Sequence, residues 1–226
     1  MEPERTLVMA CATVIEEMLP LLPPGMQHLV FDFGLHVNPN KLRSILQEAI
    51  DAVSGQYETI ILGYGMCSQA IIGVKANGCR LVAPRVDDCI AIFLGSTGAY
   101  QRQCQAEPGT YYLTKGWIEV GDTPFTDYEH AVQRYGKARA EWIYQKLRGN
   151  YKRVALINTG QYELEKYRAY ARETAERFGL RFEEIEGSNA LVKQMLFGPW
   201  DEGFVVIEPG ESFTLDQFMP SLGGAV

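Results

Sequence analysis

The chain has 226 residues, of which 46% are hydrophobic and 22% are charged, and its formal net charge at pH 7 is −7. This composition is typical of a globular protein with a sizeable core and excludes a disordered chain. The acidic balance, without a cluster of lysine and arginine, argues against nucleic acid as a partner, because phosphate contacts need concentrated positive charge.

The N-terminal residues include both acids and bases, where a signal peptide needs a basic start and a long apolar segment. No window approaches the roughly 18 uninterrupted apolar residues of a membrane-spanning helix. We therefore expect a cytoplasmic protein without a membrane partner. Its five cysteines, an odd number, favour free thiols, metal ligation or catalysis over disulfides in a reducing compartment.

The first half of the chain alternates apolar strands with helices. Strands are predicted at residues 6–10, 27–33, 59–63 and 80–83. Helical spacing of apolar residues predicts helices at 12–22, 40–53 and 69–76. The strand at 59–63 is a continuous apolar run, as expected for a parallel strand that is buried on both faces. These repeated strand–helix units predict an α/β fold with a mostly parallel, doubly wound (Rossmann-like) sheet.

The second half resumes the alternation after a looser region. Helices are predicted at 96–105, 126–147 and 162–178, and strands at 153–157, 181–185 and 204–207. The segment 110–120 is rich in aromatic residues and favours β structure. For the segment 191–197 the sequence does not distinguish helix from strand. We expect a first α/β lobe at residues 1–120 and a second, smaller α/β lobe at 121–226, with one continuous domain as the alternative.

Three cysteines stand where predicted strands end. Cys11, Cys67 and Cys89 each occupy a turn after an apolar run, and His36 follows another such run. Ligands of open α/β sheets bind beyond the carboxyl ends of the strands, so one edge of the sheet can gather all four side chains. Thiolates prefer zinc or the iron of a cluster. The sequence therefore predicts a metal centre held by the three cysteines, with His36, Asp88, a substrate atom or a partner as the fourth ligand. An iron–sulfur cluster is favoured over zinc.

Ordinary packing is the alternative for each of these residues. A free cysteine at a strand end is commonly part of the core, and a histidine in this position can cap the following helix. The spacing of the cysteines matches no compact CxxC signature. Cys79, which precedes a strand, and Cys104, in a polar helix, are interpreted as structural.

Polar residues near the cysteines are candidates for substrate binding. Gly65 and Ser68 belong to a glycine-bearing turn whose backbone amides can approach an anion or a cluster sulfide, although the dinucleotide and P-loop patterns are lacking. Arg85 and Asp88 lie beside Cys89 and either contact a substrate or form a solvated turn.

A loop-like segment further along the chain supplies two more candidates. Lys115 and Trp117 can line a pocket, with packing of the aromatic ring on the sheet edge as the alternative.

Several motifs together resemble one protein family. They are Ala10-Cys11, LHxNP at 35–39, GYGxC at 63–67, PRVDDC at 84–89 and PGTYYLTKGW at 108–117. The chain resembles the bacterial and archaeal family called domain of unknown function sixteen thirty-eight.

This resemblance implies that Cys11, His36, Cys67 and Cys89 are family motif positions. Relatives often have histidine where this chain has Asp88, and asparagine directly after the motif histidine, where this chain has valine. Members occur in anaerobes that use corrinoid-dependent methyl transfer, which implies a role in one-carbon metabolism.

Two further functions stay open at this point. One is a metal-free enzyme acting on a small acid, in which paired cysteines serve as acid and base as in cofactor-independent racemases. The location of all three marked thiols in the first half of the chain counts against it. The other is a binding or delivery protein for a corrinoid or tetrapyrrole, with a methyltransferase as its partner. The chain lacks the DxHxxG motif through which histidine ligates cobalt.

Overall fold

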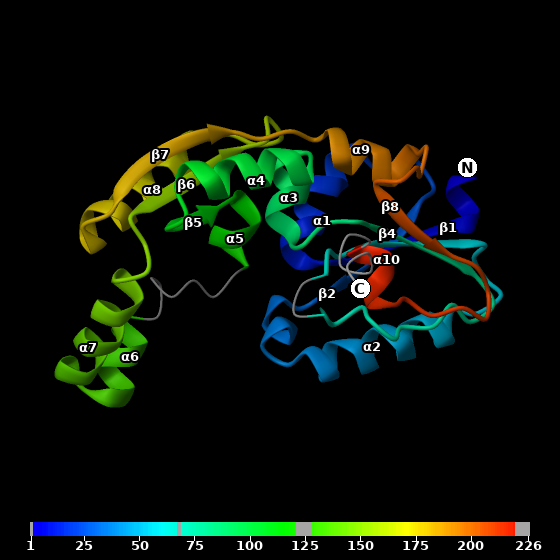
Figure 1. Ribbon diagram of the computed structural model, residues 1–226, viewed down its shortest axis with the longest axis horizontal. Coiled ribbons are helices and arrows are strands. Elements are labelled where there is room, and N and C mark those ends of the chain that lie inside the picture. The colour runs from blue at the N-terminus through cyan, green and yellow to red at the C-terminus, as the bar shows by residue number, and fades with distance from the viewer. Residues whose placement is uncertain (1, 67–68, 121–127, 220–226) are drawn as a thin grey trace, which may run out of the picture.

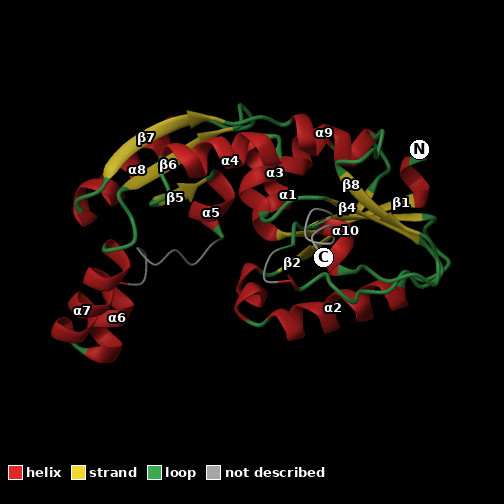
Figure 2. Cartoon of the chain, viewed as in Figure 1, coloured by secondary structure: helices red, strands yellow, loops and turns green. Residues whose placement is uncertain are grey.

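The computed structural model describes residues 2–66, 69–120 and 128–219, and the chain forms two sheets flanked by helices (Figures 1 and 2). The first sheet has five strands in the order β2-β1-β3-β4-β8. Their bounds are β1 Thr6–Cys11, β2 Gln27–Phe31, β3 Thr59–Gly63, β4 Arg80–Pro84 and β8 Phe204–Ile207. The first four are parallel, and β8 runs antiparallel to β4. The predicted α/β fold with a mostly parallel sheet is confirmed.

The central strands are buried along their whole length. Every residue of β1 and β3 is buried, as the continuous apolar runs of their sequences require for strands covered on both faces. The register pairs Gly63 with Ala10 and Cys11 with Phe31. The carboxyl ends of β2, β1 and β3 therefore lie at one edge of the sheet.

Helices cover both faces of this sheet (Figure 1). They are α1 Ala12–Met18, α2 Pro39–Ala52, α3 Cys89–Leu94, α9 Ala190–Phe197 and α10 Leu215–Phe218, with short 3₁₀ helices η1 Pro3–Arg5, η2 Leu19–Leu21 and η3 Phe33–Val37. Helix α4 Thr97–Ala106, which follows α3, lies beside the second sheet, where its Gln103 accepts a hydrogen bond from Arg153. The longest, α2, begins at an Asn38 cap whose side chain accepts a hydrogen bond from the Lys41 amide. Its buried residues Leu42, Leu46 and Ile50 recur every four positions, which places them on one face.

The second sheet has three parallel strands in the order β5-β6-β7. Its strands are β5 Thr110–Leu113, β6 Arg153–Asn158 and β7 Arg181–Glu186, and its helices are α5 Lys115–Glu119, α6 Tyr128–Tyr135, α7 Lys137–Arg148 and α8 Glu165–Phe178. The two sheets do not divide the chain at a single point, because β5 precedes residue 121 and β8 returns to the first sheet. The lobe boundary at 120/121 stays a prediction.

One predicted element is wrong. Residues 69–76 form turns instead of a helix in the described part of that segment, with Gly73 at φ +88°. The backbone there bonds to the returning C-terminal segment: the Gly73 amide donates to the Phe213 carbonyl, and the Phe213 amide to the Val74 carbonyl. Hydrogen bonds to a distant strand-like segment thus replace those of a helix.

Other predicted elements differ in extent or type. The expected helix at 126–147 begins in residues outside the described ranges, and its described part divides into α6 and α7 at Gly136, where φ is +77°. The apolar stretch 89–94 is helix α3, and the β-prone segment 110–120 forms β5 followed by α5.

The two sheets are joined through α1. Gly116 of α5 lies against Thr13 of α1, so closely that a Cβ at Gly116 would come 2.7 Å from the Thr13 carbonyl oxygen. Thr159, which follows β6, donates a hydrogen bond of 2.6 Å to the buried Glu17 carboxylate of α1. Ile157 of β6 belongs to the same hydrophobic core as the first sheet. The carboxyl edge of the first sheet is thereby held next to β5.

Among the helices of residues 2–66, 69–120 and 128–219, none combines the length and the hydrophobicity that crossing a bilayer requires.

Candidate functional site

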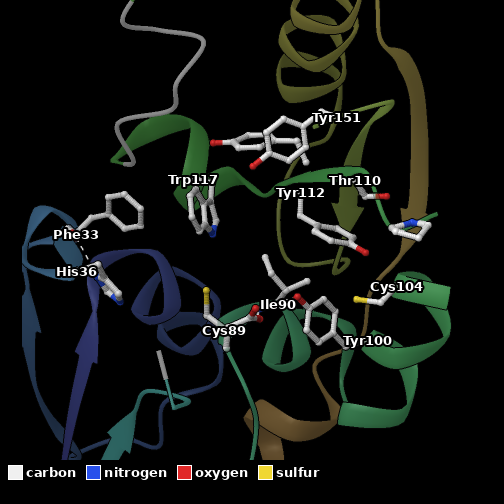
Figure 3. Close-up of a pocket in the computed structure, with 13 residues that line it drawn as sticks. Phe33, His36, Cys89, Ile90, Tyr100, Cys104, Thr110, Tyr112, Trp117 and Tyr151 are labelled. Carbon is white, nitrogen blue, oxygen red and sulfur yellow. Dashed lines mark hydrogen bonds between the residues drawn. The ribbon is translucent and has the colours of Figure 1, made fainter. Parts of the chain in front are cut away.

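A cavity of about 390 Å³ lies between the carboxyl edge of the first sheet and β5, the edge strand of the second (Figure 3). Its volume falls in the range of about 300–1,000 Å³ that is usual for small-molecule sites. The first sheet supplies His36 from η3 and Asp88 and Cys89 from the start of α3. Aromatic residues from both sheets supply most of the remaining wall. The position agrees with the rule that α/β sheets bind ligands beyond the carboxyl ends of their strands.

His36 is held in one orientation. Its Nδ1 atom lies 3.0 Å from the Phe33 carbonyl oxygen, and because a carbonyl can only accept, Nδ1 carries the proton in this hydrogen bond. The ring also stacks on Phe33 and on Tyr64, with centroid distances of 5.4 and 6.0 Å. In the neutral ring Nε2 is then the nitrogen with the lone pair, as in histidines that ligate metals or act as bases.

Asp88 joins the start of α3 to α4. Its Oδ1 accepts a 2.8 Å hydrogen bond from the Ile90 amide, which caps α3, and its Oδ2 accepts a 2.9 Å hydrogen bond from the Tyr100 hydroxyl. Burial, followed by the charge and hydrogen bond of Asp88, raises the pKa of Tyr100, so this hydroxyl stays protonated at neutral pH. Cys89, directly after the cap, is 8% exposed, and its side chain points toward Trp117 (Figure 3).

The other predicted thiol ligands are placed differently. Cys11 is the last residue of β1 and is 2% exposed, and its sulfur lies 3.4 Å from the Thr13 hydroxyl in a hydrogen bond. It is not among the residues that line the cavity. Cys67 and Ser68 lie outside the described residues. Within residues 2–66, 69–120 and 128–219, no three histidine, cysteine, aspartate or glutamate side chains are grouped to hold a metal ion.

The chain just after β3 packs against the loop that leads to Asp88. The Met66 amide donates a 2.8 Å hydrogen bond to the Val86 carbonyl. A Cβ at Gly65 would lie 2.9 Å from the same Val86 oxygen. Glycine at position 65 therefore permits a close backbone contact.

Both predicted substrate-binding cations lie outside the cavity wall. Arg85 donates to the Phe204 carbonyl at 3.3 Å, which attaches β8 to the loop after β4. Lys115 forms an ion pair of 2.7 Å with Glu16 of α1, and this hydrogen bond is the main cause that raises the pKa of Lys115. Asp88 and Trp117, in contrast, do line the cavity, and their role in substrate binding stays a prediction.

Sequence reasoning missed much of the cavity wall. Cys104, for which the sequence favours a structural role, lines the cavity together with Tyr100, one helical turn earlier on α4. This four-residue spacing places both side chains on one face of the helix and was the available signal. Tyr111 and Tyr112 of β5 also line the cavity.

Comparisons with known proteins identify a family without assigning an activity. No curated protein and no solved structure matches the chain. The family described as "Protein of unknown function (DUF1638)" matches residues 30–196, which is more than half of the chain. This range contains His36, Cys89 and the other residues that line the cavity. The chain therefore belongs to the family "Protein of unknown function (DUF1638)".

Proposed function

We propose that this protein holds a metal centre at the carboxyl edge of its first sheet, beside the aromatic cavity. The observation that carries the proposal is that His36 and Cys89, from the ends of two different strands, line the same cavity. An imidazole and a thiolate are both ligands that zinc and iron prefer. An iron–sulfur cluster is the first choice of centre, and zinc is the alternative.

The described residues fit such a centre in part. The Phe33 carbonyl orients His36 through its Nδ1 atom, as hydrogen bonds to the non-ligating nitrogen commonly orient histidines that ligate metals. Cys11 ends β1, a neighbour of β3 in the sheet, and would serve as a further thiolate after a change of its side-chain rotamer away from Thr13. Cys67 completes the proposed set as a ligand expected from the sequence. A bound centre would supply electron transfer or Lewis-acid chemistry next to the cavity.

The test is the metal content of anaerobically purified protein. Iron, zinc, cobalt and acid-labile sulfide are measured per chain, before and after reconstitution with ferrous iron and sulfide or with zinc. We expect stoichiometric metal in the wild type and a loss of most of it in Cys89→Ser and His36→Ala. Wild-type protein that is folded by circular dichroism and takes up no metal under either condition would contradict the proposal.

Cys79 provides the matched control. It is also buried, at 2% exposure, but it precedes β4 and so lies at the opposite end of the strand from Cys89. Cys79→Ser introduces the same chemical change at a distance from the cavity. We expect it to retain the wild-type metal content. Equal loss in both serine variants would mean that the effect comes from destabilisation and not from ligation.

A metal-free thiol enzyme is the second candidate, because Cys89 and Cys104 line the same cavity. In such an enzyme one thiolate removes the α-proton of a small acid and the other thiol returns a proton to the opposite face. Incorporation of deuterium from D₂O into a panel of amino and hydroxy acids, followed by NMR, tests this. Loss of exchange in both Cys89→Ser and Cys104→Ser, with no metal in the wild type, would favour this candidate over the metal centre.

A further inference from the structure

The cavity wall is unusually rich in aromatic rings, and this feature is independent of the proposed metal centre. Six of its residues are aromatic: Phe33, Tyr100, Tyr111, Tyr112, Trp117 and Tyr151. They come from η3, α4, β5, α5 and the loop before β6. Figure 3 labels all of them except Tyr111 and shows the labelled rings around a shared open space. Rings contributed by so many separate segments indicate a built enclosure.

Neighbouring rings meet at steep angles. Phe33 and Trp117 have centroids 4.8 Å apart and an interplanar angle of 70°. The centroids of Tyr111 and Tyr151 are 5.3 Å apart, with an interplanar angle of 87°. Tyr100 of α4 and Tyr112 of β5 have centroids 6.0 Å apart and an interplanar angle of 69°. Rings that meet edge to face turn their faces in different directions, so rings from separate segments can border one space from different sides.

The charge of the wall has one sign. Asp88 is the carboxylate among the described lining residues, and these residues include no lysine or arginine. Burial is the largest cause that raises the pKa values of Tyr100, Tyr111 and Tyr112, so the phenols stay neutral at physiological pH. Neutral aromatic faces and a carboxylate both attract a cation.

The hydrogen bonds of Asp88 narrow the class of cation. Its two oxygens already accept from the Ile90 amide and from the Tyr100 hydroxyl. A primary ammonium needs acceptors for three N–H groups and would lose hydration in this enclosure. A methylated ammonium has no such need, because its methyl groups contact ring faces directly. A carboxylate or phosphate would find no lysine or arginine in the described wall.

We propose that the cavity binds a small metabolite through a quaternary methylammonium head, with the aromatic rings as a cage and Asp88 as the counter-charge. The cavity, at about 390 Å³, has room for more than the head alone. This ligand class would place a methylated nitrogen beside the thiol of Cys89.

A titration with choline and with its neutral isostere 3,3-dimethylbutan-1-ol tests the charge requirement. The two probes have nearly the same shape, and only choline carries the positive charge. Amide and indole NMR signals of the isolated protein report binding, with Trp117 in the cavity and Trp142, which is 59% exposed, as an internal reference. We expect the Trp117 signal to shift and choline to bind about tenfold more tightly than the isostere. Equal affinity, or no shift up to saturating choline, would overturn the proposal.

Substitutions in the cage give an independent test. Tyr112→Phe keeps the ring and should keep choline affinity within about twofold, whereas Tyr112→Leu removes the ring face and should weaken it about tenfold. Asp88→Asn keeps the cap of α3 but removes the charge, and should weaken choline without weakening the isostere. Tyr135→Leu, at a residue 48% exposed and outside the cavity, is the control. If Phe and Leu at position 112 behave alike, the ring is not a wall of the binding site.

Metal content is measured on the same variants and keeps the two proposals apart. The cage substitutions at Tyr112 remove no candidate ligand, so they should change choline affinity and leave metal content unchanged. If the protein binds choline but contains no metal, the proposal of a metal centre is rejected and the proposal of the cage is retained. Metal binding without any preference for the cation would reject the cage alone.

Discussion

Cys79 and Cys89 flank the same strand, β4, and their surroundings differ sharply. Both are buried, at 2% and 8% exposure. Cys79 lies at the amino end, where burial, followed by the charge of Asp51, raises the pKa of its thiol. Cys89 lies at the carboxyl end, beside a helix cap and in the wall of the cavity.

The segments that cover the amino ends of the strands in the first sheet differ from those at the carboxyl ends. At the amino edge, Arg80 forms a 2.8 Å ion pair with Glu208, and Asn77 donates a 2.6 Å hydrogen bond to Asp51. At the carboxyl edge, loops lead into helices and β5 packs nearby, which leaves a hollow (Figure 3). Position along a parallel strand, more than burial or residue type, decides whether a thiol can meet a ligand.

The largest expected effect comes from crowding the carboxyl edge at Gly65. Gly65→Ala would place a Cβ 2.9 Å from the Val86 carbonyl oxygen and displace the loop that leads to Asp88. We expect a loss of about 2 kcal/mol in the free energy of unfolding, measured by urea denaturation. Gly98→Ala in α4 is the control, because its nearest neighbour would be the end of a flexible Arg102 side chain at 3.6 Å. It should gain up to about 1 kcal/mol. Equal effects would mean that the contact at Gly65 is not tight.

Thiol alkylation compares the two cysteines directly. Under native conditions, iodoacetamide should modify Cys89 on the order of tenfold faster than Cys79, because Cys89 lines the cavity and the raised pKa of Cys79 reduces its thiolate. Peptide mapping by mass spectrometry gives both rates in one sample. In urea the two rates should converge. Equal alkylation rates of Cys89 and Cys79 under native conditions would show that the position of a thiol at the carboxyl or amino edge does not control its access to the reagent.

The cap of α3 should contribute less. Asp88→Ala removes the acceptor of the Ile90 amide and should cost about 1 kcal/mol, whereas Asp88→Asn retains an acceptor and should cost less. At the amino edge, Asp51 caps no helix and is exposed. Asp51→Ala removes only exposed hydrogen bonds, such as the one from Asn77, and should cost about 0.5 kcal/mol. Urea denaturation of the three variants measures these losses of stability. Equal losses for Asp88→Ala and Asp51→Ala would mean that the cap of α3 contributes no more than an exposed contact at the amino edge.

The smallest expected effect is a pH dependence of the free energy of unfolding that comes from Glu17. Burial is the main cause that raises the pKa of this carboxyl above its ordinary value of 4.5. The folded state therefore binds the proton more tightly than the unfolded state. Stability falls as the pH rises from about 4.5 to the folded pKa and is constant above it.

Glu17→Gln removes this titration and retains an acceptor for Thr159. The stability of the variant relative to wild type should therefore be greater at pH 8 than at pH 4.5, by urea denaturation. Glu208→Gln, at an exposed ion pair of the amino edge, should show a smaller difference between the two pH values. A Glu17→Gln effect that is the same at both pH values would contradict the raised pKa.

Local sequence patterns were enough for the central strands and for the longest helix of the first sheet. The apolar run at 59–63 coincides with β3, because a strand buried on both faces needs apolar residues at every position. The apolar spacing after Asn38 coincides with α2, because a helix buried along one stripe needs apolar residues every three or four positions. The helix predicted at 69–76 failed because the segment around Phe213 takes its hydrogen bonds. A partner so far along the chain leaves no trace in the local pattern.

For the candidate site, the sequence by itself determined that His36 and Cys89 follow strand ends, since parallel strands direct their carboxyl ends to one edge. Only the tertiary structure decided which residues share a cavity. It brought Cys104 and the tyrosines of β5 to the wall and left Cys11, at the start of α1, outside it. The physical reason is that the second sheet packs on the first through α1 and α5, and such contacts depend on shapes that become complementary only after both sheets have formed.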